Sequence, residues 1–216
     1  MSENGQNFIA GAWCDGQGTI ANINPSDLSD QIGHYAQADS AQLDSALDAA
    51  RTAQKKWAAT GLEARQTILM NIGNELMERR VELGTLLSRE EGKPLAEGVG
   101  EIYRAGQFFT YYAAEVLRQL GQNAQSVRPG VDIDIRREPV GTVAVISPWN
   151  FPLAILTGMS VAGIVAGSPV IIKPAEPSNA IAAAPVEPPL ACLSTAAEVV
   201  SISLILWSIS PSVMPR

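Results

Sequence analysis

Three polar side chains that could act on a carbonyl group and a nucleotide follow two short apolar runs of the chain. Asn150 comes shortly after the run Val143–Ile146, whereas Lys173 and Glu176 follow the run 170–172. An amide can donate a hydrogen bond to an oxyanion, and a cation and a carboxylate can both bind ribose hydroxyls. These residues therefore predict a site at which a polarised carbonyl lies beside a nucleotide.

The elements that would position these side chains form a βαβ unit. Both apolar runs are β-branched and lack polar alternation, which is typical of parallel strands covered on both faces. The segment 153–165 between them is apolar, has no interior proline and is long enough for a crossover helix. Because ligands bind beyond the carboxyl ends of such strands, both polar loops should open on one edge of the sheet. No G-x-G-x-x-G follows the first strand, so the ordinary phosphate-binding fingerprint is not predicted there.

The two loops carry motifs of a known family. The segments ISPWNFP at 146–152 and KPAE at 173–176 resemble the aldehyde dehydrogenase superfamily in both letters and spacing. The resemblance runs from about residue 7 to residue 183 and includes EGKP at 91–94. Less than half of a family chain is present, so an incomplete aldehyde dehydrogenase fold is expected. Within the family, VRPGVD at 127–132 looks most similar to 2-oxoglutarate semialdehyde dehydrogenases.

The resemblance implies a role for each matching residue. Asn150 corresponds to the family's oxyanion donor, and Lys173 and Glu176 correspond to its ribose-binding pair. Further cofactor contacts are implied at Ile146, Ser147, Pro148, Trp149 and Ala175. Phe151 and Ile155 fall where family members line the aldehyde tunnel. The implied cofactor is NAD, with NADP possible, because a carboxylate at Glu176 would repel a 2′-phosphate. No metal site is predicted.

Each of these residues also has a purely structural explanation. Asn150 precedes a predicted helix, and asparagine is a preferred N-cap residue. Lys173 would be an exposed lysine at the end of a strand, and Glu176 a carboxylate favoured by a helix N-terminus. Trp149 and Phe151 would be core aromatics.

The family nucleophile is not found in these 216 residues. The resemblance implies a cysteine after a Gly-Gln pair and a general-base glutamate, whereas Cys14 and Cys192 both lie in other settings. By resemblance the function is NAD(P)-dependent oxidation of an aldehyde to a carboxylic acid, in a truncated chain that is itself predicted to be inactive. The alternative is a noncatalytic fragment or remnant with at most a binding or assembly role.

The rest of the chain divides into three regions by pattern. Residues 1–138 form a helical region with helices expected from Asp39 to about Ala59, across 68–76, across 83–87 ending near Gly92, and across 99–120. At its end, residues 124–138 form a hairpin with a half-buried strand, which mediates subunit association in the family. Residues 139–183 begin a Rossmann-like NAD-binding domain, and 184–216 form an aberrant apolar tail rich in proline and serine.

Composition limits the partners and the compartment. The net charge of −7 argues against nucleic acid or an anionic membrane as a partner. No signal peptide is recognisable at the start of the chain, and two unpaired cysteines fit a reducing cytoplasm. The partner expected from the family is a small aldehyde. A homo-oligomer is also usual there, although it is doubtful for a fragment. His34 is predicted to be a turn residue.

Overall fold

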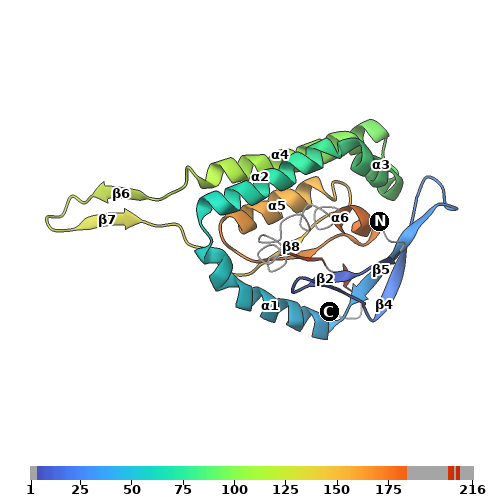
Figure 1. Cartoon of the computed structure of the whole chain (residues 1–216), viewed down its shortest axis with the longest axis horizontal. Coiled ribbons are helices and arrows are strands. Elements are labelled where there is room, and N and C mark those ends of the chain that lie inside the picture. The colour runs from blue at the N-terminus through green and yellow to red at the C-terminus, as the bar shows by residue number, and fades with distance from the viewer. Residues whose placement is uncertain (1–3, 184–203, 207, 210–216) are drawn as a thin grey trace.

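The structure is a computed structural model that describes residues 4–183, 204–206 and 208–209. It has the expected α/β fold, in which helices lie on both sides of a central sheet (Figure 1). The helices are α1 (Ser40–Ala59), α2 (Leu62–Glu78), α3 (Arg80–Glu91), α4 (Leu95–Val116), α5 (Ala154–Val165), the 3-10 turn η1 (Glu176–Ser178) and α6 (Asn179–Ala183). The strands are β1 (Asn4–Gly5), β2 (Asn7–Ile9), β3 (Ala12–Cys14), β4 (Gly18–Ile23), β5 (Gln31–Ala38), β6 (Gln122–Gln125), β7 (Asp132–Ile135), β8 (Val143–Ile146), β9 (Val170–Lys173), β10 (Leu204–Leu206) and β11 (Ser208–Ile209). None of the helices described is long and apolar enough to cross a membrane.

The predicted βαβ unit is confirmed as β8, α5 and β9. The two strands pair in parallel, with Val143 opposite Val170 and Ile146 opposite Lys173. β9 is buried on both faces, as the sequence predicts. The same expectation is wrong for β8, because Ala144 and Ile146 are exposed on one of its faces, Ile146 by 69%. An apolar run therefore predicts a strand here, but it does not predict that both faces of the strand are buried.

Strands from the two ends of the described chain complete the sheets. The central sheet has the order β3-β2-β10-β9-β8, in which β10 runs parallel to β9 and antiparallel to β2. A second sheet is built around β5, which pairs with β1, β4 and β11. His34 lies within β5 and not in a turn, so that prediction is wrong. Of the tail predicted at 184–216, the segments β10 and β11 are strands, and the remainder lies outside the described residues.

Helices α1 and α5 cover opposite faces of the central sheet. The side chain of Asp39 caps α1 by accepting a 2.8 Å hydrogen bond from the Gln42 N–H, which confirms the predicted helix start. Ala46 of α1 packs against Ile171, whereas the flanking Val170 and Ile172 belong to the main core on the α5 side. This alternation follows from the two-residue repeat of a strand.

Helices α2 and α4 form a further layer over α5, and α3 continues this layer over α6 (Figure 1). They approach closely at paired glycines. A Cβ on Gly73 would lie 2.9 Å from the Gly106 oxygen, and a Cβ on Gly98 would lie 2.6 Å from the Gly84 oxygen. The predicted end of α3 is confirmed at Gly92, where φ is +70°. α4 ends at Val116, four residues before the end of the predicted stripe.

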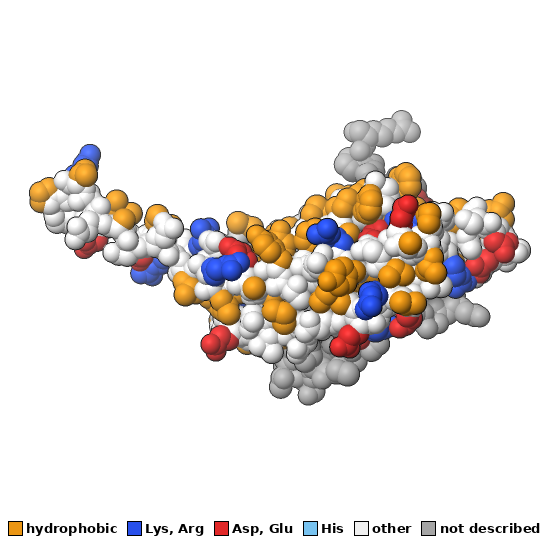
Figure 2. Space-filling view, turned by 90° about the horizontal axis from the view of Figure 1, so that it is seen from above, with side chains coloured by type: hydrophobic (Ala, Val, Ile, Leu, Met, Phe, Trp, Pro, Cys, Tyr) orange, Lys and Arg blue, Asp and Glu red, His pale blue; other side chains and the backbone are white. Residues whose placement is uncertain are grey.

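Strands β6 and β7 form the expected antiparallel hairpin, which projects from the body as an arm (Figure 1). Figure 2 shows hydrophobic side chains along this arm and over the helical face. The predicted half-burial of its second strand is wrong in this chain, because Ile133 and Ile135 are 43% and 48% exposed. The hairpin extends beyond the body, so no described element covers either of its faces.

Candidate catalytic and cofactor-binding edge

The loops after β8 and β9 meet at the carboxyl edge of the central sheet. Ile146 pairs with Lys173, and the Ser147 N–H donates a 3.2 Å hydrogen bond to the Lys173 oxygen. The structure thus brings the two predicted motifs together. Pro148 and Trp149 are exposed beyond the strand end, whereas Ser147 is buried and its Oγ has no partner among the residues described.

Asn150 is exposed at this edge and does not cap the following helix. The first N–H groups of α5 are instead satisfied by Glu101 of α4, whose Oε1 accepts from Leu153 N at 3.0 Å and from Ala154 N at 3.1 Å. The capping explanation for Asn150 is therefore wrong. Within the described chain its side-chain amide has no hydrogen-bond partner, while its backbone oxygen accepts from Lys93 Nζ at 2.9 Å. The amide is free to donate to a ligand.

Lys173 and Glu176 lie on the second loop and do not pair with each other. Lys173 is half-buried, and its Nζ donates to the Pro174 oxygen at 3.0 Å. Glu176 is exposed in the first turn of η1, where a carboxylate is favoured by the aligned peptide dipoles. Ala175 precedes it in extended conformation. Among the described residues no side chain forms a hydrogen bond or ion pair with the Glu176 carboxylate. The side chains of Lys173 and Glu176 are therefore both available to a ligand.

Phe151 and Ile155 line one open hollow of about 520 Å³ between α4 and α5. The same hollow includes Arg104 and Phe108 of α4, which the sequence analysis missed. Arg104 is exposed and has no ion-pair partner in the part of the chain that the structure describes. The core explanation for the aromatic side chain of Phe151 is wrong, since it is half exposed, with Lys93 Nζ 5.1 Å from its ring centre.

The carboxylates beneath the edge are functional candidates that no sequence pattern singled out. Burial raises the pKa of Glu90 to about 8, even though its carboxylate accepts hydrogen bonds from the N–H groups of Ala180 and Ile181 and from the Asn22 side chain. Burial likewise raises the pKa of Glu91 to about 7, with Lys93 opposing that shift. A signal was present in the sequence for Glu101, because it is an acidic residue beside Ile102 in an otherwise apolar stripe.

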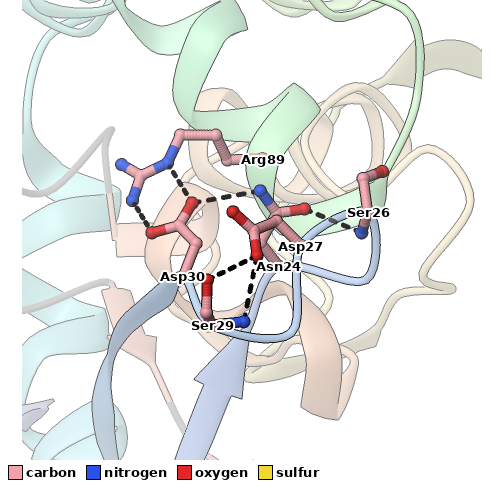
Figure 3. Close-up of polar contacts among 6 residues, drawn as sticks. All are labelled: Asn24, Ser26, Asp27, Ser29, Asp30 and Arg89. Carbon is pink, nitrogen blue, oxygen red and sulfur yellow. Dashed lines mark hydrogen bonds and ion pairs between the residues drawn. The ribbon is translucent and has the colours of Figure 1, made fainter.

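A polar loop fixes the end of α3 that carries Glu90 (Figure 3). Arg89 forms a two-point ion pair with Asp30, with contacts of 2.9 and 2.6 Å. Asn24 donates to the same carboxylate at 3.0 Å and accepts from the Ser26 N–H. The hydrogen bonds from Arg89 and then Asn24 lower the pKa of Asp30 to about 2. The loop after β4 is thereby joined to α3.

The fold is α/β and places two polar loops at one edge of a parallel strand pair, and comparison with known proteins gives the family. The model of the aldehyde dehydrogenase family matches residues 13–188. The chain belongs to the aldehyde dehydrogenase family, as the motifs at 146–152 and 173–176 predict.

Its relatives include enzymes named for semialdehydes. The chain is 35% identical over 180 residues to a non-phosphorylating aspartate-semialdehyde dehydrogenase of Halomonas elongata, covering 82% of this chain and 36% of that protein. It is 32% identical to an alpha-ketoglutarate semialdehyde dehydrogenase of Haloferax volcanii, covering 81% of this chain and 37% of that one. The crystal structure of an NADP-dependent enzyme of Escherichia coli matches with a TM-score of 0.87 and 29% identity, covering 97% of this chain and 43% of that chain. The chain thus spans less than half the length of the proteins it matches.

Proposed function

We propose that this chain contributes the oxyanion donor and the ribose-binding residues for NAD(P)-dependent oxidation of an aldehyde to a carboxylic acid. The observation that supports this most directly is the free side-chain amide of Asn150 on the edge that also carries Lys173. Negative charge develops on the aldehyde oxygen when a nucleophile adds to the carbonyl carbon, and the amide would donate a hydrogen bond to that oxygen. The nicotinamide cofactor, when bound, accepts the hydride.

Cofactor binding provides the first test of this proposal. NAD⁺ should give saturation-transfer NMR signals with the chain, and Lys173→Ala and Glu176→Ala should each weaken them. Lys55→Ala is a matched control, because Lys55 is an exposed lysine of α1. Glu176→Gln should raise NADP⁺ binding relative to NAD⁺, since it removes a charge that repels a 2′-phosphate. Equal binding by all four variants would contradict the assignment of the ribose site.

The substrate class that fits the hollow is an aldehyde bearing a carboxylate. Arg104 supplies a cation that has no ion-pair partner among the described residues, beside the apolar side chains of Phe151 and Ile155. The relatives described above are named for semialdehydes of dicarboxylic acids. Arg104→Met should abolish binding of a carboxylated aldehyde observed by NMR, without affecting an uncharged aldehyde of similar length. Arg51→Met, on the exposed side of α1, serves as the control. Loss of both aldehydes in Arg104→Met would contradict a charge-specific role.

The 216 residues by themselves are proposed to bind without turnover, which retains the noncatalytic alternative for this chain. Cys14 lies on β3, at the opposite edge of the central sheet from β8 and Asn150. Burial raises the pKa of its thiol, which disfavours the nucleophilic thiolate. Cys192 lies outside the described residues. Formation of reduced cofactor from an aldehyde by the pure chain, if abolished by Cys14→Ser or Cys192→Ser, would overturn this part of the proposal.

The hairpin of β6 and β7 is proposed as an interface between subunits. Its exposed apolar side chains Ile133 and Ile135 lie on the arm and have no cover in the described chain. Ile133→Asp should lower the mass of any oligomer measured by sedimentation, whereas Asp134→Asn, on the alternate face of the same strand, should not. An unchanged oligomer in Ile133→Asp would exclude this surface.

A further inference from the structure

Two buried carboxylates cap the helices that follow the strands of the βαβ unit. Glu101 of α4 accepts from the Leu153 and Ala154 N–H groups at the start of α5, and Glu90 of α3 accepts from the Ala180 and Ile181 N–H groups in α6. Each carboxylate comes from the helical layer and not from the loop that it holds. The side chains of the loop residues at the sheet edge therefore do not need to accept hydrogen bonds from these N–H groups.

The two caps differ in their electrostatic partners. The side chain of Glu101 is 1% exposed, and its Oε2 forms a 2.7 Å ion pair with Lys93 Nζ. The same Lys93 nitrogen donates to the backbone oxygen of Asn150. Glu90, by contrast, accepts from Asn22 and has no cationic partner in the described chain. Only the loop that carries Asn150 is therefore held by an ion pair.

Lys93 and Glu101 together fix both sides of the loop that carries Asn150. Lys93 holds the Asn150 carbonyl, and Glu101 holds the backbone three and four residues later. The first N–H groups of a helix require an acceptor, and asparagine is well suited to supply one. Asn150 lies three residues before Leu153, the spacing at which an N-cap side chain accepts from a helix N–H, so its side-chain oxygen would take that role without the carboxylate. The amide would then be drawn toward the helix and away from a ligand.

We propose that Glu101, held by Lys93, is the positioning residue that keeps the Asn150 amide free by capping α5 in its place. The role of that amide as oxyanion donor rests on the proposed function, whereas the positioning itself does not. Lys93 also lies over the Phe151 ring, so the same ion pair joins the amide to the wall of the hollow. Both are positioning residues, because neither is required to touch the aldehyde.

Hydrogen exchange by mass spectrometry on the full chain tests the positioning directly. Glu101→Gln places an amide NH₂ or a weaker acceptor opposite Lys93 and the two N–H groups, so exchange of residues 150–156 should become roughly tenfold faster. Glu90→Gln is the matched control, because it alters the equivalent cap on the neighbouring loop. It should accelerate exchange at 176–183 and leave 150–156 unchanged. Equal acceleration of both segments by both variants would mean a general loss of stability and would overturn the proposal.

The side-chain NMR signal of Asn150, assigned by its loss in Asn150→Asp, distinguishes positioning from stability. In the unmodified chain its NH₂ protons should exchange and shift as those of a free amide. In Glu101→Gln the signal should move as the side chain turns toward the Leu153 N–H, and Lys93→Arg should preserve the original position. An unmoved signal in Glu101→Gln would overturn the proposal. Should that variant not fold, Glu101→Asp tests the same shift, because the shorter side chain keeps a charge near Lys93 but withdraws the acceptor from the Leu153 and Ala154 N–H groups.

These readouts separate the positioning from the proposed function. They need neither an aldehyde nor a cofactor, so the positioning can hold while NAD⁺ and aldehyde binding both fail. In that case the positioning of the Asn150 amide by Glu101 would be supported, and its role as oxyanion donor would be rejected. Conversely, normal ligand binding by a Glu101→Gln chain whose Asn150 signal is unmoved would retain the function and reject the positioning.

Discussion

Glu90→Gln should flatten the dependence of stability on pH between about pH 5 and pH 8. Burial raises the pKa of Glu90 from its ordinary 4.5 to about 8, so the folded chain holds this proton more tightly than the unfolded chain. The stabilising effect is complete below pH 4.5 and is lost as the pH rises through about 8. At about 1.4 kcal/mol per pH unit, the loss over this interval is roughly 5 kcal/mol as an upper bound.

Urea unfolding at a series of pH values, followed by circular dichroism, measures this effect. The glutamine keeps a carbonyl acceptor for the Ala180 N–H but turns an NH₂ toward a neighbouring donor, so Glu90→Gln should be less stable than the unmodified chain at low pH. The two curves should converge toward pH 8. Glu91, whose pKa of about 7 is also raised, gives a smaller slope of the same sign in both proteins. Parallel curves for the two proteins would refute the assignment of this slope to Glu90.

Three further predictions concern the scaffold that holds the edge. Gly84→Ala should lower the unfolding free energy by roughly 1–3 kcal/mol in urea titrations, because its Cβ would lie 2.7 Å from backbone atoms of Val99; an unchanged midpoint would show that the helices can separate at no cost. Trp57→Phe should lower it by roughly 1 kcal/mol or more, since it removes the 2.8 Å bond from Nε1 to the Ile164 oxygen. Asp30→Asn should make acid unfolding begin at higher pH. The pKa of Asp30 is lowered from 3.8 to about 2, so this carboxylate stabilises the fold above pH 3.8 and the stabilisation is lost as the pH falls through 2. Identical acid titrations of the two proteins by circular dichroism would contradict a stabilising role for this loop.

The features that the sequence predicted correctly are those encoded by neighbouring residues. The cap at Asp39 and the left-handed Gly92 are local signals, and both occur where predicted. The βαβ unit and the family could be recognised because their motifs are contiguous in the chain. The chemistry of the edge was therefore assigned to suitable residue types, although their roles stay predictions.

The features that the sequence missed depend on partners far along the chain. From the sequence, Asn150 was as suitable for a helix cap as for an oxyanion donor. The structure decides against the cap, because Glu101, about fifty residues earlier in the chain, accepts from the N–H that Asn150 would have capped. Ile146 is exposed because the face of β8 that carries it is not packed in the core, which no local pattern predicts. Arg104 was missed because its partner surface on α5 is brought to it only by the packing of α4. Periodicity identifies an element but does not identify what covers it.

A residue with both a structural and a functional explanation is best judged by whether its structural need is already met by another group. For Asn150 that need is met, because the donors it would have capped are satisfied by Glu101. For Glu176 both explanations fit, since its place in the first turn of η1 is itself favourable for a carboxylate. The two explanations of Glu176 predict different results for Glu176→Gln. A structural role requires reduced stability at unchanged preference between NAD⁺ and NADP⁺, whereas a ribose-binding role requires a changed preference whatever the change in stability.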